Sequence, residues 1–318
     1  MLLSIFVFII GLAILILSSD YLVQSSVKLS LLFRLSPLFI GLILVAFGTS
    51  APESGVGIVA AVKNQKDIAL GNIVGSNISN IGLILGLCAL IQGLNIQKSV
   101  LRRELPLMIF STVLIYVLCL DLILTRWDGL ILLGLFGVFL AVSYRTAKTS
   151  FTQKEVENFQ FKGLMRRPLN IFAIIVIGIL SLVGLVGGAD LMVRSGVSLA
   201  RTLGISSWVI ALTAFAIGTS LPELAASLSA SLKRVPSISV GNIVGSNIFN
   251  ILFVLGIVSL IRPVRLSPEV LRFEMPVMVV FSFLLWILMR TGYRISRKEG
   301  LFLLSGYILF LFFIFRRG

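Results

Sequence analysis

The sequence Gly48-Thr-Ser-Ala-Pro-Glu53 lies inside an apolar run and returns, with one residue changed, as Gly218-Thr-Ser-Leu-Pro-Glu223. In each copy the glutamate is the only charged residue for many positions around it, between residues 37 and 62 and between residues 205 and 232. A charged side chain near the middle of a membrane-length segment costs at least ~2.5–3.5 kcal/mol on insertion scales. Both glutamates are therefore candidate functional residues.

The composition indicates a polytopic membrane protein. Of 318 residues, 58% are hydrophobic and 13% are charged, whereas soluble domains carry roughly 25% charged residues. The net charge of +14 comes from lysines and arginines that lie between apolar runs. This placement is typical of topology signals, so no nucleic-acid partner is expected. The two cysteines lie in apolar segments and read as small core residues.

The chain divides into apolar segments that are long enough to cross a bilayer. The longest polar stretch, from Arg145 to Pro168, separates two halves of five segments each. The predicted organisation is a first half at residues 1–146, a linker at 147–168 and a second half at 169–318. The ten predicted segments lie near residues 2–19, 36–62, 67–92, 104–124, 127–146, 169–193, 205–232, 237–261, 270–290 and 298–315.

The two halves repeat each other at a constant offset of 170 residues, which carries Asp20 to Asp190 and Glu53 to Glu223, as well as many polar residues between and beyond them. Because each half has an odd number of segments, the second half enters the membrane from the opposite side. The predicted fold is an all-α polytopic membrane protein of ten transmembrane helices in two inverted-topology repeats. Such repeats bind their substrates near the membrane midplane, at the interface between the repeats.

The distribution of basic residues predicts the orientation. If the N-terminus is outside, the inner loops hold 17 of the 27 lysines and arginines, six of them in the linker. The positive-inside rule then places both termini outside and the linker in the cytoplasm, with the chain in the plasma (inner) membrane.

The repeated motif gathers oxygen ligands. Thr49 and Ser50 lie four and three residues before Glu53, so on a helix the three side chains share a face. Pro52 removes a backbone donor and is expected to free carbonyls near Ala46 and Phe47. Unpaired carbonyls at membrane depth are tolerated only where protein buries them or a cavity exposes them, and a cation offers them a partner.

A second motif follows each copy of the first. Gly71-Asn-Ile-Val-Gly-Ser-Asn-Ile-Ser-Asn80 places asparagine, serine and asparagine at intervals of four residues. The resulting polar stripes are Asn72, Ser76 and Asn80 in the first half, and Asn242, Ser246 and Asn250 in the second.

The ligand types favour hard cations. Calcium takes six to eight oxygens in forgiving geometry. With no histidine in the chain and neither cysteine in the motifs, zinc, copper and nickel are not expected. Two ionised glutamates neutralise one divalent cation, and monovalent ions could occupy several sub-sites of the same cluster instead. Protons are expected to compete for two neighbouring carboxylates.

The paired motifs in two five-segment halves resemble the sodium/calcium exchanger family within the calcium/cation antiporters, over nearly the whole chain. The resemblance implies that Glu53, Glu223, Thr49 and Thr219 bind calcium. It also implies long tilted first and sixth segments that slide across the core. It implies sodium sites formed with Ser50, Ser76, Ser220, Ser246, Asn80, Asn250 and the carbonyls of Ala46 and Ala216.

The chain departs from the family pattern in informative places. Ala51 replaces the usual leucine in the first motif. Asn250 stands where the potassium-dependent branch favours aspartate, and Gly-Thr-Ser stands where the proton-coupled branch usually has Gly-Asn. The large calcium-sensing loop of animal members is absent from the sequence. A prokaryotic exchanger without potassium co-transport is the expectation.

Structural interpretations compete with these roles. A buried glutamate can be held by hydroxyls or backbone alone. Glycines spaced by four residues, at 71 and 75 and at 241 and 245, are also close-packing motifs for membrane helices. Asn72 and Asn242 suit helix-to-helix hydrogen bonding as well as ion coordination. Asn77 and Asn247 are expected to be structural. Asp20 and Asp190 lie near segment ends, where a carboxylate can reach water. Glu104 and Glu274 are expected at the membrane interface.

The sequence therefore predicts a sodium-driven calcium antiporter that works by alternating access, as a monomer in the lipid bilayer and without a cofactor. Calcium/proton exchange through the same carboxylates is the alternative within transport. A passive cation channel would pass ions without any counter-ion, and a structural membrane protein would show no ion dependence. The sequence contains no arrangement of nucleophile and base residues typical of an enzyme, so an enzyme is not expected.

Overall fold

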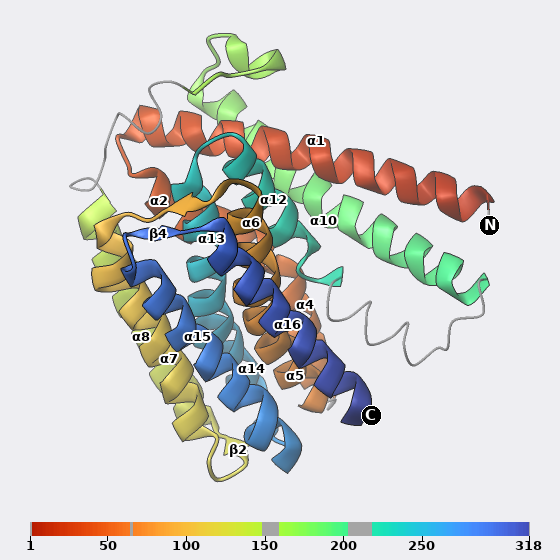
Figure 1. The fold of residues 1–318 in the computed structure, drawn as a ribbon, viewed down its shortest axis with the longest axis vertical. Helices are drawn as coiled ribbons and strands as arrows, with labels where there is room; N and C mark the ends of the chain where they lie inside the picture. Colours follow the sequence, from red (N-terminus) through yellow and green to blue (C-terminus); the bar gives the residue numbers. More distant parts are fainter. Residues whose placement is uncertain (1, 64–65, 148–158, 203–217, 318) are drawn as a thin grey trace.

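Two helices of 32 residues each, α1 (Leu2–Phe33) and α10 (Ile171–Thr202), lie side by side along one side of a helical bundle (Figure 1). The computed structural model describes residues 2–63, 66–147, 159–202 and 218–317. Both helices continue well beyond the predicted segments at 2–19 and 169–193, whose ends are therefore wrong. The apolar run of α1 stops before Asp20, but the helix continues because its polar second half finds partners in the linker.

The rest of the bundle is helical apart from two short sheets, and several helices contain a π-helical turn (η). In the first half these elements are α2 (Pro37–Ile40), η1 (Gly41–Val45), α3 (Ala46–Thr49), α4 (Ala51–Val62), α5 (Lys66–Ser79), η2 (Asn80–Leu85), α6 (Gly86–Gln92), η3 (Val100–Glu104), α7 (Leu105–Leu118) and α8 (Arg126–Ala147). The linker contains the 3-10 turn η4 (Gly163–Arg166). The second half contains α12 (Leu221–Leu232), α13 (Pro236–Ile248), η5 (Phe249–Val254), α14 (Leu255–Ile261), η6 (Val270–Glu274), α15 (Met275–Arg290) and α16 (Arg297–Arg317).

Within the described residues, six helices are long and apolar enough to cross a membrane, and seven if the bent pair Pro37–Thr49 and Ala51–Val62 is one span. This count is smaller than the ten segments that the sequence predicts. Part of the difference comes from predicted segment 205–232, of which residues 205–217 lie outside the described part of the chain.

The two small sheets each join one strand from either half of the chain. β1 (Leu94–Asn95) pairs with β4 (Arg294–Ile295), and β2 (Ile123–Leu124) pairs with β3 (Val264–Arg265), both antiparallel. The elements also recur near the 170-residue offset: α4 and α12 each span 12 residues, and η3 and η6 each span five. The halves are thus interleaved in the bundle.

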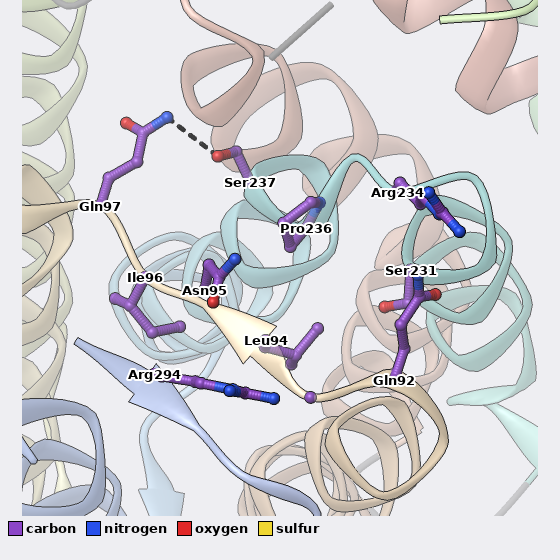
Figure 2. A pocket seen from close by; sticks show the side chains of 11 residues that line it. Gln92, Leu94, Asn95, Ile96, Gln97, Ser231, Arg234, Pro236, Ser237 and Arg294 are labelled. Carbon is purple, nitrogen blue, oxygen red and sulfur yellow. Dashed lines mark hydrogen bonds between the residues drawn. The ribbon is translucent and has the colours of Figure 1, made fainter. Parts of the chain in front are cut away.

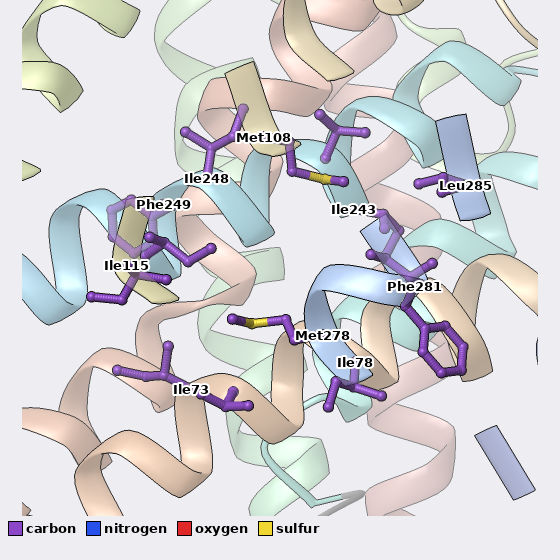
Figure 3. Packing of buried hydrophobic residues seen from close by; sticks show 14 of the residues in the cluster. Ile73, Ile78, Met108, Ile115, Ile243, Ile248, Phe249, Met278, Phe281 and Leu285 are labelled. Carbon is purple, nitrogen blue, oxygen red and sulfur yellow. The ribbon is translucent and has the colours of Figure 1, made fainter. Parts of the chain in front are cut away.

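The centre of the bundle is an apolar cluster between α5, α7, α13 and α15 (Figure 3). Met108 of α7 and Met278 of α15 lie close to the same central region. The Asn247 amide contacts the Met108 sulfur, and the Asn77 amide contacts the Met278 sulfur. Close packing of such side chains fixes the relative positions of the helices. Labelled members of the cluster are Ile73, Ile78, Met108, Ile115, Ile243, Ile248, Phe249, Met278, Phe281 and Leu285.

Glycines allow α13 to lie directly against the chain at α2 and η1. A Cβ atom at Gly245 would stand 2.3 Å from the Leu42 carbonyl oxygen, and one at Gly241 would stand 2.6 Å from the Leu38 carbonyl oxygen. The predicted packing role of this glycine pair is confirmed. A Cβ atom added at Gly71 or Gly75 would meet no described atom of a neighbouring element within 4 Å, so the same role there stays a prediction.

The described end of the linker, from Phe159, docks against α1 and the end of α12. The backbone N–H of Lys162 donates to Gln24 Oε1 at 2.6 Å, and the Lys28 ammonium donates to the Arg167 carbonyl at 2.9 Å. Lys233, which follows α12, forms an ion pair with Asp20 and lies over the Phe159 ring. Asp20 is therefore not at a helix end, as the sequence indicated, but within α1.

Candidate functional site

The first glutamate motif sits where one helix ends and another begins, and the second motif leads into the start of α12 at Leu221. α3 ends at Thr49, α4 begins at Ala51, and the two meet at an angle of 45°. Pro52 is tolerated because it lies in the first turn of α4, where its missing N–H has no helical partner. Glu53 lies in that first turn, and Glu223 lies in the first turn of α12. The partial positive charge of a helix N-terminus favours a carboxylate at both positions.

The carbonyl of Ala46 is not left without a donor, contrary to the sequence-based expectation. It accepts the Ser50 backbone N–H at 3.0 Å and the Thr49 hydroxyl at 3.4 Å. The physical reason is register: Pro52 removes the donor that an α-helix would pair with residue 48, four positions earlier. The corresponding residue, Ala216, lies outside the described residues.

The two halves meet through the serines of the motifs. The Ser50 hydroxyl lies 2.8 Å from Glu223 Oε1 and 2.9 Å from the Ser246 hydroxyl. At the related position, the Ser220 hydroxyl lies 3.4 Å from that of Ser76, which in turn lies 3.4 Å from Glu53 Oε1. Each motif serine therefore contacts the stripe serine of the other half. The predicted residues converge on one site.

The motif threonines join the same cluster through the stripe asparagines. The Thr49 hydroxyl donates to Asn242 Oδ1 at 3.1 Å, and the Thr219 hydroxyl donates to Asn72 Oδ1 at 3.4 Å. Asn242 also donates to the Ser227 hydroxyl at 2.9 Å. Asn72 and Asn242 thus form hydrogen bonds with side chains of other segments of the bundle, as the structural interpretation of these two residues predicts. Sequence analysis missed Ser227, although it lies four residues after Glu223.

Four oxygens of the predicted ligands have no hydrogen-bond donor among the described residues. They are one carboxylate oxygen each of Glu53 and Glu223 and the amide oxygens of Asn80 and Asn250. The exposed fraction of each of these side chains is 1% or less. Buried acceptors are nearly always paired in proteins, so each such group calls for an explanation. Two carboxylate and two amide oxygens are ligands that a hard cation accepts.

Asn77 and Asn247 determine where those amide oxygens point. The Asn80 amide nitrogen donates to Asn247 Oδ1 at 2.9 Å, and the Asn250 amide nitrogen donates to Asn77 Oδ1 at 3.1 Å. Asn77 and Asn247 also donate to each other's backbone carbonyls, at 3.5 and 3.4 Å. With the amide nitrogens held in this way, the amide oxygens of Asn80 and Asn250 point away from these bonds and meet no donor among the described residues. The structural role predicted for Asn77 and Asn247 fits these contacts.

The site differs from a transition-metal centre in its chemistry. The described residues contain no group of three or more histidine, cysteine, aspartate or glutamate side chains that could hold a metal ion. Only two carboxylates are present, and they lie near enough to interact electrostatically. The remaining oxygens come from neutral hydroxyls and amides. Such a set suits a calcium ion or several sodium ions more than zinc or copper.

The other predicted acidic residues lie away from this cluster. Asp190 is exposed and pairs with Arg194 at 2.8 Å on α10. Glu104 is 6% exposed and pairs with Arg103 at 3.1 Å. Neither residue is joined to the central site by a hydrogen bond among those that the structure describes.

Comparison with known proteins places the chain. The family model for the sodium/calcium exchanger protein matches residues 3–145 and 173–316. The chain is 32% identical over 345 residues to the sodium/calcium exchanger MaX1 of Methanosarcina acetivorans, covering 97% of both chains. It is 37% identical over 317 residues to the inner membrane protein YrbG of Escherichia coli, covering 98% of this chain and 96% of that one.

The fold is also that of a solved exchanger. The sodium-calcium exchanger NCX_Mj, in crystals soaked with sodium and calcium, superposes with a TM-score of 0.83 at 31% identity and covers 96% of this chain and 97% of its own. The sequence match, the coverage and the fold agree. The chain belongs to the sodium/calcium exchanger protein family of ion-transporting membrane antiporters.

Proposed function

We propose that this protein exchanges sodium for calcium across the membrane, with Glu53 and Glu223 at the cation site. The observation that carries the proposal is the set of four buried oxygens, at Glu53, Glu223, Asn80 and Asn250, for which the described part of the chain offers no hydrogen-bond donor. One calcium ion balances two ionised carboxylates. Sodium ions can use the same carboxylates together with hydroxyl oxygens, so the two cations exclude each other. Mutually exclusive occupancy is the requirement for exchange.

The remaining predicted ligands complete this proposal. Thr49 and Thr219 would join the glutamates at the calcium site. Sodium would bind where the motif serines meet the stripe serines and asparagines of the other half. This second set comprises Ser50, Ser76, Ser220, Ser246, Asn80, Asn250 and the carbonyls of Ala46 and Ala216. The Ala46 carbonyl would bind sodium by exchanging the longer of its two hydrogen bonds, that from the Thr49 hydroxyl at 3.4 Å, for the ion, because a carbonyl oxygen has two lone pairs.

The proposed architecture is ten membrane segments in two inverted repeats of five. The recurrence of elements near the 170-residue offset supports it, as does the pairing of strands between halves. The basic linker would lie in the cytoplasm, with both termini outside. The protein would work as a monomer in the plasma (inner) membrane.

Alternating access would arise from movement of α1 and α10 against the core. In the most apolar part of α1 only 17% of residues are buried, and in α10 22%, against 78% for Leu70–Gln92 and 83% for Pro236–Ile261. Few contacts therefore oppose a shift of the pair. Gly11 and Gly188 bring the two helices together closely, so they would move as one body.

A flux measurement tests the proposed function. The pure protein is reconstituted in liposomes loaded with sodium, and radiolabelled calcium uptake is measured in sodium-free choline or potassium buffer at fixed pH. Uptake that requires the outward sodium gradient is the expected result. Uptake that ignores sodium but follows an imposed pH gradient would support calcium/proton exchange instead, for which the two neighbouring buried carboxylates provide the chemistry. Calcium flux without any counter-ion would indicate a channel.

A further inference from the structure

A second set of buried polar residues leads away from the central site along the interface of α12 and α13. Glu223, Ser227 and Ser231 are spaced by four residues, so they line one face of α12. Across the interface, Asn242 donates to the Ser227 hydroxyl at 2.9 Å, and the Ser231 hydroxyl donates to that of Ser239 at 3.1 Å. All five side chains are at most 2% exposed.

This polar interface is present in one half of the chain only. At the offset of 170 residues, Ser227, Ser231 and Ser239 correspond to Gly57, Ala61 and Ala69. Burying a hydroxyl costs free energy unless it is hydrogen-bonded. The first half avoids this cost with residues that have no hydroxyl, so the first half shows that α-helices can pack at this interface without serines. The three hydroxyls call for a reason beyond helix packing.

The outer end of the interface opens into a cavity of about 670 Å³ (Figure 2). Ser231 lines it from the end of α12, and Ser237 lines it from the start of α13 while accepting a hydrogen bond from Gln97 at 2.9 Å. Arg234 and Arg294 also line the cavity. Ser231 thus belongs both to the cavity wall and to the hydrogen-bonded interface.

The inner end of the interface is Glu223. One oxygen of its carboxylate has no hydrogen-bond donor among the described residues, and its side chain is fully buried. Its backbone carbonyl accepts the Asn242 amide at 3.4 Å. The serines therefore lie between the cavity and a carboxylate of which one oxygen has no hydrogen-bond donor among the described residues.

We propose that the α12–α13 interface, through Ser227, Ser231 and Ser239, is the route by which sodium ions pass between this cavity and the central site. The proposal rests on the proposed function. Between Glu223 and the cavity the route offers neutral oxygens and no carboxylate, which can replace water around a monovalent ion. Calcium binding relies on charged ligands. The two arginines at the cavity repel a divalent cation twice as strongly as a monovalent one, because Coulomb energy scales with the charge.

The test removes the outer hydroxyl pair with the double variant Ser231→Ala/Ser239→Ala. Each serine loses its serine partner together with its own hydroxyl, so only the weakly donating Cys88 thiol is left without these partners and little stability should be lost. Sodium-driven calcium uptake into liposomes is expected to fall about tenfold, the effect of losing about one net oxygen contact at the transport barrier. Exchange of external for internal calcium without sodium, measured with radiolabelled calcium, should stay at the wild-type rate.

The matched control is Ser259→Ala, which removes a buried hydroxyl that bonds only to backbone carbonyls of its own helix. This variant is expected to leave both fluxes unchanged. An unchanged sodium-driven flux in the double variant, or an equal loss of both fluxes, would overturn the proposal. A wild type without sodium-driven flux would contradict the proposed function itself, and the inference with it, before any variant is compared.

Inhibition by silver ions at the native Cys88 thiol gives a second test, in which Ser227, Ser231 and Ser239 stay unchanged. Cys88 is buried within hydrogen-bonding reach of the Ser231 and Ser239 hydroxyls, whereas Cys119, also buried, lies elsewhere, near Asp121 and Asp128. Silver ions, which bind thiols and carry one positive charge, should reach Cys88 during turnover. Silver should inhibit the wild type and Cys119→Ala but not Cys88→Ala. Inhibition that does not depend on Cys88 would overturn the route.

Discussion

Glu53→Gln and Glu223→Gln are each expected to abolish sodium-driven calcium uptake. Each substitution removes one of the two negative charges that would hold the cation but keeps the side chain's shape. A unit charge pair at 4 Å in an effective dielectric of 20 is worth about 4 kcal/mol, which corresponds to roughly a thousandfold in Kd. The loss should be at least that large for calcium, which carries two charges. Radiolabelled calcium uptake in liposomes measures it.

Thermal unfolding in detergent separates loss of binding from loss of folding. Without cations, both glutamine variants should be as stable as the wild type or more stable, because a buried charge is removed. Calcium should raise the Tm of the wild type by binding to the folded state, and this rise should disappear in both variants. Asp190→Asn is the matched control, since Asp190 is exposed and pairs only with Arg194 among the described residues. Retained uptake in Glu53→Gln would contradict the proposed site.

Gly245→Val is expected to lower the stability of the protein more than any change to a helix surface. The Cβ atom would stand 2.3 Å from the Leu42 carbonyl oxygen and 2.9 Å from the Ala46 Cβ atom, and neither atom can move without shifting the backbone. Overpacking of this kind costs about 3 kcal/mol or more. The measurement is the Tm in detergent, together with the yield of protein that elutes as a single species.

Gly137→Val is the control for the loss of a helix glycine, because no described atom lies within 4 Å of the position that its Cβ would take. It should change the Tm little. Because Gly245 packs against the segment that leads into Thr49 and Ser50, a milder change, Gly245→Ala, should also reduce transport. A Gly245→Val variant as stable as the wild type would show that α13 and the chain at Leu42 can separate freely.

The central cluster could be predicted from sequence because its signal is doubled. A lone buried glutamate has many explanations, but Glu53 and Glu223 recur with the same hydroxyls at the same spacing. The spacing of four residues in the stripes placed Ser76 and Ser246 on the correct faces. Their partners from the other half, Ser220 and Ser50, are found in the structure.

Other features depend on contacts that a linear pattern does not contain. The apolar run of α1 ends before Asp20, yet the helix reaches Phe33 because Gln24 and Lys28 bind the linker. The orientation of the Asn80 amide depends on Asn247, which is 167 residues away. The hydrogen bonding of the Ala46 carbonyl depends on local helix register, which composition does not determine. In each of these cases the sequence did not reveal which distant or neighbouring group a residue contacts, although the residue types themselves were read correctly.

The docked end of the linker has a consequence for how the chain can be divided. Phe159 and Phe161 pack into the apolar cluster that includes Leu22 and Val23 of α1, while the same stretch of chain continues into α10. A chain cut before Phe159 would leave this segment attached to the second half and still bound to the first. The two fragments would then be held together by the linker's side chains as well as by the bundle, so that continuity of the main chain is not the only tie between them.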